Sequence, residues 1–227
     1  MARVIVVGSI NQDVTVTVDR FPAPGETLSG SSLTYGLGGK GANQAAAAAR
    51  SGIPTLFVGA VGTDLAGHSL RTHLAAHGVD VTHLREVDSP SGTALITVAA
   101  SGENTIILDA GANRASSIAH AKASLFPAPS DIVVLQAEIP PAANAAAIEW
   151  AHSFGARVLL NLAPARATDP ATLSRVDILV VNETEAGLTL GMPAPATPTE
   201  AIGVARALRG MGPRHVVVTL GAQGAAW

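Results

Sequence analysis

The sequence predicts an α/β fold in which a mostly parallel β-sheet forms the core. Short continuous runs of Val, Ile and Leu alternate along the chain with longer alanine-rich segments of helical length. Uninterrupted apolar runs of strand length are typical of strands covered on both faces, as in parallel sheets. The repeated order of strand and helix indicates βαβ units. A third pattern, in which apolar and polar residues alternate one by one, predicts a second, smaller sheet with one covered face.

The core elements can be read in chain order. Apolar runs predict strands at residues 4–7, 55–61, 132–135, 158–161, 178–181 and 216–220. Between them, length, alanine content and Ser or Thr starts predict helices at residues 42–50, 65–77, 117–125, 142–154 and 199–211. The proline-rich segment 193–198 is expected to be a rigid loop that leads into the last helix.

One-by-one alternation marks the strands of the second sheet. Valines alternate with threonines within 13–19, and the same period returns on both sides of the turn-like AASGEN. These segments predict a small antiparallel sheet that covers the core as a lid, with the polar segment 21–32 joining two of its strands. Because the lid segments are distant in sequence, residues 1–227 are predicted to form one domain. We expect lid strands within three ranges: 13–19, 30–37 and 92–109.

Composition excludes several classes of function. The chain of 227 residues has a formal net charge of -3, no block of Lys and Arg, and no cysteine. Electrostatic binding to nucleic acid or to an anionic membrane is therefore not expected, and neither are disulfides or thiolate metal sites. The sequence contains no run of about 20 apolar residues, so no membrane span is predicted. The start MARVIVVGSINQD lacks the apolar segment of a secreted protein, so a cytoplasmic location and a small-molecule partner are expected.

A glycine-rich loop opens directly onto an alanine-rich helix in YGLGGKGANQAAAAARSG, residues 35–52. Gly36, Gly38 and Gly41 match the dinucleotide fingerprint, and Asp64 lies at about the right distance to bind a ribose hydroxyl. That fingerprint should follow the first core strand directly, however. Here GSINQD follows the first strand, and the glycines come much later. A phosphate loop also fails, because no Ser or Thr follows Lys40.

What the glycines offer physically is close approach of the backbone to a ligand, because no Cβ interferes. The helix at 42–50 would then direct its free N–H groups to the same place, where Lys40 and Asn43 add donors. Such a site suits a small polyhydroxylated molecule. The alternative is a tight turn that caps a helix.

Seven short motifs follow one another along the chain: GSINQD (8–13), FPAPGET (21–27), GGKGANQA (38–45), DAGAN (109–113), NLAPA (161–165), NETEA (182–186) and TLGAQG (219–224). Together they resemble the PfkB carbohydrate kinase family. The resemblance spans residues 8–224, and GGKGANQA combined with NETEA is far more specific than a lone glycine pattern. It implies a ribokinase-like three-layer core under a β lid, phosphorylation of a sugar hydroxyl by ATP with Mg²⁺, and a homodimer formed through the lid. GSINQD with GGKGANQA points to D-ribose, with ribose 5-phosphate as the product.

By the same resemblance, six residues bind the sugar: Asn11, Asp13, Gly39, Lys40, Asn43 and Glu138. An amide and a carboxylate on the first lid strand can each take several hydrogen bonds from sugar hydroxyls. Glu138, which follows the strand at 132–135, resembles the carboxylate that closes the site from the core. Without the resemblance, Asn11 and Asp13 fit a turn at a strand end, and Glu138 fits a solvated surface.

Four further residues resemble those that hold the nucleotide: Asn182, Glu185, Thr219 and Gly221. Asn182 and Glu185 follow the strand at 178–181, at the carboxyl end where ligands bind in open α/β sheets. Their N-x-x-E spacing matches the family motif that organises Mg²⁺ and phosphates, with Glu185 acting on the metal through water. The same spacing also fits an N-cap and its capping-box partner, and both roles can coexist.

The chain departs from the family pattern in one respect. The G-A-G-D signature, whose aspartate is the catalytic base and whose glycines form an anion hole, does not occur in the sequence. A strand starting near Gly224 also stops at Trp227, so we expect a C-terminally incomplete chain with no catalytic base of its own. The family's monovalent-cation (K⁺) site would be missing too, and the chain is predicted to be inactive or impaired.

Three other functions are left open at this point. A complete sugar half without a catalytic base fits a non-catalytic sugar-binding or dimerising module. A kinase of another sugar or of a nucleoside fits the same framework. A nicotinamide-dependent enzyme is suggested only by the glycines at 36–41.

Overall fold

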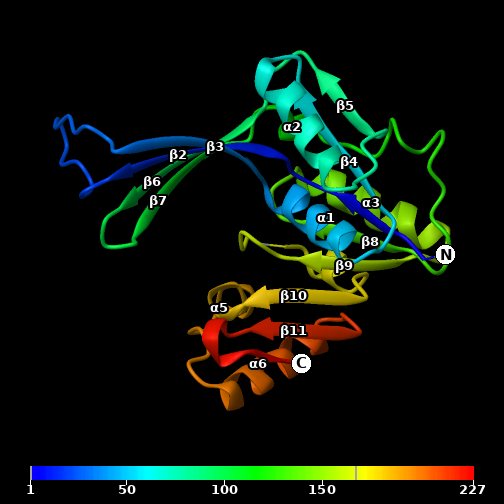
Figure 1. Cartoon of the computed structure of the whole chain (residues 1–227). Helices are drawn as coiled ribbons and strands as arrows, with labels where there is room; N and C mark the ends of the chain where they lie inside the picture. Colours follow the sequence, from blue (N-terminus) through cyan, green and yellow to red (C-terminus); the bar gives the residue numbers. More distant parts are fainter. Residues whose placement is uncertain (1, 167) are drawn as a thin grey trace.

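A computed structural model describes residues 2–166 and 168–227 and confirms the predicted α/β fold (Figure 1). Eight strands form the core sheet in the order β12-β11-β10-β9-β8-β1-β4-β5. Neighbouring strands run parallel, except that β11 and β12 are antiparallel. The bounds are β1 Val4–Val7, β4 Thr55–Gly62, β5 Leu84–Val87, β8 Ile132–Gln136, β9 Arg157–Asn161, β10 Ile178–Asn182, β11 His215–Thr219 and β12 Ala225–Ala226.

Helices lie on both faces of this sheet. On one face α1 and α2 pack against a cluster that contains Phe57, Leu70 and Leu74. On the other face α3 and α6 pack against a larger cluster that contains Ile148 and Leu208. Burial of both faces explains why the strands are continuously apolar. The helices are α1 Lys40–Arg50, α2 Leu65–Ala76, α3 Pro141–Ser153, α4 Pro170–Leu173, α5 Glu183–Leu190 and α6 Pro198–Gly210, with 3₁₀ turns at Gly111–Ala115 and Gly221–Gln223.

Four strands form a separate small sheet that extends away from the core (Figure 1). We call this sheet the lid. Its order is β3-β2-β6-β7, with β2 Asn11–Val18, β3 Ser32–Gly38, β6 Gly92–Ala99 and β7 Asn104–Asp109. The two outer pairs are antiparallel, as expected, whereas the central pair β2–β6 is parallel. The parallel pair arises because β2 and β6 both run outward from the core, whereas β3 and β7 return along them.

The structure differs from the sequence prediction in a few elements. Residues 117–125 form successive turns instead of a helix, in which Ala121 and Lys122 donate to Ile118, and Ser124 and Leu125 donate to Ala121. A segment this short gains little from helix cooperativity, and prolines follow it directly. The strand β5 and the helix α4 were not predicted, and α5 was anticipated only by the alternative that made Asn182 an N-cap. No helix within residues 2–166 and 168–227 is both long and apolar enough to cross a membrane.

Candidate functional site

A cavity of about 280 Å³ lies at the carboxyl-terminal edge of the core sheet. It is lined from one side by the start of α1 and from the other by the ends of β9, β10 and β11. This is the edge where ligands bind in open α/β sheets. Five residues singled out from the sequence line this one cavity: Lys40, Asn43, Asn182, Glu185 and Thr219.

Asn182 and Glu185 form a complete capping box at the start of α5. The Asn182 Oδ1 atom accepts from the Glu185 amide at 2.7 Å, and the Glu185 Oε2 atom accepts from the Asn182 amide at 2.9 Å. Because each side chain uses one polar atom in the cap, the Asn182 amide nitrogen and the second Glu185 oxygen have no partner among the described residues. The capping role therefore leaves these two atoms available to a ligand in the cavity.

Thr219 is the last residue of β11 and Gly221 follows the strand, but only Thr219 lines the cavity. The Thr219 hydroxyl lies 3.4 Å from the Val181 carbonyl oxygen, which it faces as a weak donor. Gly221 begins a 3₁₀ turn with a φ of 51°, and a Cβ there would meet no atom within 4 Å. Gly221 is therefore not among the residues that line the cavity, and its positive φ favours glycine in this turn.

On the lid side, β2 carries Asn11 and Asp13 on the same face of the strand. Asn11 is buried, and its Oδ1 atom accepts from the Asn113 Nδ2 atom at 2.7 Å. Asn113 also bonds both backbone groups of Ile10, at 2.9 and 3.0 Å, so the start of β2 is fixed to the 3₁₀ turn after β7. A Cβ at Gly38 would lie 1.9 Å from the Asp13 Oδ1 atom, so only glycine leaves room for this carboxylate.

Asp13 and Glu138 bring two carboxylates together at the base of the lid. Burial of Asp13, and secondly the negative charge of Glu138, raise the pKa of the Asp13 carboxyl group. Two neighbouring carboxylates, which accept hydrogen bonds, suit a ligand that donates several hydrogen bonds, as a sugar does.

The N-terminus of α1 differs from the sequence expectation, because its amide groups are already bonded. The Lys40 amide donates to the Glu138 Oε2 atom at 2.9 Å. The next two amides, of Gly41 and Ala42, donate to the hydroxyl and the carbonyl of Ser9, at 3.2 and 2.9 Å. The prediction that these N–H groups point freely at a ligand is therefore wrong. The loop is instead held tightly, and Gly39, with a φ of 87°, permits its turn.

Three residues of the site were missed by sequence reasoning: Gln44, Asn161 and Gln136. The Gln136 Nε2 atom donates to the Gln44 Oε1 atom at 2.7 Å, beside the cavity that Gln44 and Asn161 line. The side-chain oxygens of Gln136 and Asn161 are buried and lack a hydrogen-bond partner among the described residues. Gln44 and Asn161 lay inside recognised motifs, GGKGANQA and NLAPA, but amides have no pattern that separates ligand contact from ordinary packing.

The dinucleotide interpretation of the glycines fails in the structure. Gly36 and Gly38 lie in lid strand β3 and not in a turn between a core strand and its helix. Asp64 caps α2 through the Gly67 amide at 2.8 Å, and it accepts from the hydroxyl and amide of Ser91 at 2.6 and 2.8 Å. Burial acts to raise the pKa of Asp64, but these hydrogen bonds outweigh it and lower the pKa. The Asp64 carboxylate therefore has a structural role, as the cap of α2 and the partner of Ser91.

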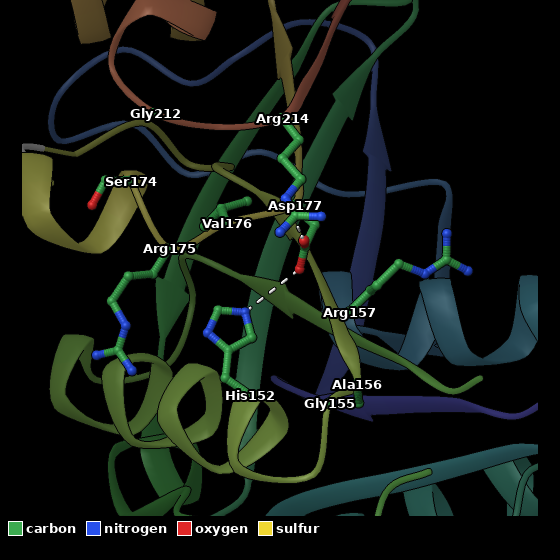
Figure 2. Close-up of a pocket in the computed structure, with 10 residues that line it drawn as sticks. All are labelled: His152, Gly155, Ala156, Arg157, Ser174, Arg175, Val176, Asp177, Gly212 and Arg214. Atoms are coloured by element: carbon green, nitrogen blue, oxygen red, sulfur yellow. Dashed lines mark ion pairs between the residues drawn. The ribbon is translucent and has the colours of Figure 1, made fainter. Parts of the chain in front are cut away.

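A second cavity, of about 340 Å³, opens at the opposite, amino-terminal edge of the sheet (Figure 2). At its centre the Asp177 carboxylate lies 3.5 Å from both His152 and Arg214, and it accepts from the Val158 amide at 2.8 Å. Figure 2 shows the Arg157 and Arg175 guanidinium groups directed away from Asp177. None of the residues singled out from the sequence lies here, and the cationic groups do not converge on one point.

Within residues 2–166 and 168–227, no three His, Asp or Glu side chains lie together in an arrangement that would hold a metal ion.

The sequence and the structure both have relatives among known proteins. The model of the pfkB family carbohydrate kinases matches residues 1–227. Ribokinase of Haemophilus influenzae is 39% identical over 221 residues, which cover 96% of this chain and 72% of that protein. Deoxyribokinase of Salmonella typhi is 35% identical over 238 residues, covering 99% and 74%. The structure of Arabidopsis thaliana ribokinase complexed with ribose and ATP superimposes with a TM-score of 0.89 at 33% identity, covering 99% of this chain and 74% of that one.

Proposed function

Because the chain belongs to the pfkB family of carbohydrate kinases, we propose that it binds D-ribose and ATP and serves the transfer of a phosphoryl group to the sugar's primary hydroxyl. Ribose 5-phosphate would be the product. The relatives include both ribokinases and deoxyribokinases, so the choice of ribose rests on the sequence motifs and on the ribokinases among the relatives.

One observation carries this proposal: a single cavity is lined by some members of each of the two groups of residues singled out from the sequence. Lys40 and Asn43 line it from the glycine-rich loop, and Asn182, Glu185 and Thr219 line it from the strand ends. Phosphoryl transfer depends mainly on positioning donor and acceptor in line and on neutralising charge. A cavity between the glycine-rich loop and the strand ends supports this proposal, because sugar and nucleotide could meet there.

Asn11, Asp13 and Glu138 are proposed to bind the sugar hydroxyls, with Gly39 giving the loop its close approach. The supporting geometry is the pair of neighbouring carboxylates at the base of the lid, one on lid strand β2 and the other in the turn that follows core strand β8. A sugar between Asp13 and Glu138 would link the lid to the core, and lid closure would exclude water that competes for the phosphoryl group.

Asn182 and Glu185 are proposed to organise Mg²⁺ and the phosphates, with Lys40 contributing positive charge. The donor set fits: one carboxylate, side-chain amides and the unpartnered buried Oδ1 atom of Asn161 offer oxygens, which Mg²⁺ prefers, often through water. When bound, the metal would neutralise charge on the phosphates.

Homodimerisation through the lid is proposed from an exposed apolar row. The register places Tyr35, Val14, Leu95 and Ile107 side by side across all four lid strands. Tyr35, Leu95 and Ile107 are 63%, 52% and 70% exposed. The row lies on the face opposite to Asp13, because adjacent residues of a strand point to opposite faces. Contact between two copies would cover apolar surface without closing the sugar site.

The catalytic base is proposed to lie outside the residues assigned above, since the sequence contains no G-A-G-D. The second candidate function, a sugar-binding module without turnover, is favoured by the same observation. Production of ADP that depends on ribose, measured with the 227-residue chain, separates the two. Turnover supports a kinase complete in itself, whereas binding without turnover supports the module.

Calorimetric titration of D-ribose into the folded chain tests the substrate assignment directly. Saturable binding that is stronger than that of 2-deoxyribose, D-fructose and adenosine is the expected result. Preference for any of these three would overturn the choice of ribose and leave the family assignment intact.

A further inference from the structure

Ser9 is a fully buried residue between β1 and β2 that the sequence analysis did not assign. Its hydroxyl donates to the Glu138 Oε2 atom at 2.5 Å and accepts from the Gly41 amide at 3.2 Å. Its carbonyl oxygen accepts from the Ala42 amide at 2.9 Å. Three segments far apart in the sequence therefore meet at this one small side chain.

These bonds replace an ordinary helix cap. Helix α1 begins after Gly39, which has no side chain to accept from the first free amides. Glu138 accepts the first of these amides and Ser9 accepts the next two. A hydroxyl is suited to this position because it donates and accepts at the same time. The space allows little else, since a Cβ on Gly41 would lie 2.6 Å from the Ser9 backbone nitrogen.

The arrangement divides the Glu138 carboxylate into two unlike halves. Its Oε2 atom receives both the Ser9 hydroxyl and the Lys40 amide. Its Oε1 atom has no donor among the residues that the structure describes. With one oxygen held by two donors, the carboxylate cannot rotate freely, and the other oxygen has a fixed position.

We propose that Ser9 is a positioning residue that orients Glu138, so that the Oε1 atom accepts a hydrogen bond from one hydroxyl of the bound sugar. This inference rests on the proposed function, which places a sugar between the lid and the core. Ser9 touches no ligand itself; it acts through Glu138 and through the loop at Gly39–Gly41. Loss of the Ser9 hydroxyl should therefore reduce the preference for ribose over the analogue that lacks this one hydroxyl, in addition to lowering affinity in general.

The test compares ribose with its 1-, 2-, 3- and 5-deoxy analogues by calorimetry. The Glu138→Gln variant is measured first, to identify the hydroxyl that Glu138 recognises. It is the hydroxyl missing from the analogue whose loss of affinity relative to ribose becomes smaller in this variant. Ser9→Ala is expected to weaken ribose binding about tenfold, because one charge-assisted hydrogen bond is lost, and to reduce discrimination against that same analogue.

A matched control exists in Ser91, which is also buried and also bridges a carboxylate and a glycine amide, those of Asp64 and Gly62. Ser91→Ala removes an equivalent hydroxyl at the start of α2. It should lower the melting temperature as Ser9→Ala does, but leave the pattern of discrimination among the deoxy sugars unchanged.

Wild-type affinity and wild-type discrimination in folded Ser9→Ala would overturn the inference. If Ser9→Ala does not fold, Ser9→Thr decides, because it keeps the hydroxyl: retained discrimination supports the inference, and loss of discrimination in a folded protein contradicts it. If the chain binds another monosaccharide instead of ribose, the ribose assignment fails, and the same comparison made with that sugar's deoxy analogues still decides the role of Ser9. Binding of no monosaccharide by the wild-type chain would overturn both proposals.

Discussion

Asp13, on lid strand β2, and Glu138, in the turn that follows core strand β8, lie close enough for the charge of Glu138 to act on Asp13. Burial and then this charge raise the pKa of Asp13 above its ordinary value of 3.8. As the pH rises through 3.8, the unfolded chain loses this proton before the folded one does, so stability falls. We expect Asp13→Asn to be more stable than the wild type at pH 7 and equal to it at pH 3 in thermal unfolding.

The same substitution should impair sugar binding, because a charge-assisted hydrogen bond becomes a neutral one. A loss of about tenfold or more in ribose affinity is expected. Asp19→Asn, at the exposed end of the same strand, serves as the control and should change neither quantity. An Asp13→Asn variant that is less stable at pH 7, or that binds ribose normally, would contradict the assigned role.

Asn182→Ala should affect both stability and nucleotide binding. Loss of the cap of α5 is expected to cost about 1 kcal/mol in the free energy of unfolding. Thr197→Ala removes a comparable cap, whose hydroxyl accepts from the Glu200 amide at 3.2 Å at the start of α6. Both variants should melt earlier, but only Asn182→Ala should weaken Mg²⁺-dependent ATP binding in calorimetry. If the two variants bind ATP equally well in the presence of Mg²⁺, Asn182 has only a structural role.

Ile107→Glu should separate a lid-mediated dimer into monomers, because it places a charge in the exposed apolar row. Sedimentation velocity would show this as a lower apparent mass. Leu65→Glu, on the first turn of α2 and 92% exposed, adds the same charge away from the lid and should leave the association state unchanged. A wild-type chain that is monomeric at high concentration would refute the proposed interface at once.

Asp131→Asn should destabilise the core strongly. The Asp131 side chain is fully buried and accepts from the Arg3 amide and guanidinium and from the Ala128 amide, at 2.7 to 3.0 Å. Removing one partner of such a pair is expected to cost about 3 kcal/mol. Glu26→Gln breaks a forked pair with Arg20 on the surface, and it should have little effect on unfolding.

The pH dependence provides a second check on Asp131. Burial acts to raise its pKa, but the hydrogen bonds from Arg3 and Ala128 outweigh burial and lower it below 3.8. The stability that Asp131 contributes is therefore present above pH 4 and is lost as the pH falls through the lower, folded pKa. Chemical denaturation below pH 4 should show the wild type approaching the Asp131→Asn variant. A constant gap between the two proteins would contradict this assignment.

Much of the fold could be predicted because burial on both faces leaves a direct trace in the sequence. The apolar run at Val4–Val7 gave β1 with its observed bounds, and the run at 178–181 gave all of β10 except its last residue. Strand β5 was missed because it lies at the sheet edge, where Arg85 and Glu86 interrupt the apolar pattern. The parallel pairing of β2 with β6 could not be predicted, because pairing direction depends on how the two strands leave the core.

The site was harder to predict than the fold. Lys40, Asn43 and Asn182 stood in specific motifs, and the structure brings them to one cavity. The free amides of α1 were a reasonable inference from helix geometry, but Ser9 and Glu138 satisfy them from other segments. No local pattern reveals such partners, because the contact exists only after the chain has folded.

The hydrogen bonds that hold the first turn of α1 join residues far apart in the sequence, and this separation affects how the chain folds during synthesis. The Lys40 amide and the Glu138 carboxylate are 98 residues apart, and β8 reaches β1 only after the whole lid has been synthesised. Helix α1 can form early from local contacts, whereas its first turn waits for a partner that leaves the ribosome much later. A nascent chain arrested before residue 138 would thus carry the lid and the glycine loop, but its loop would lack the bonds that hold it.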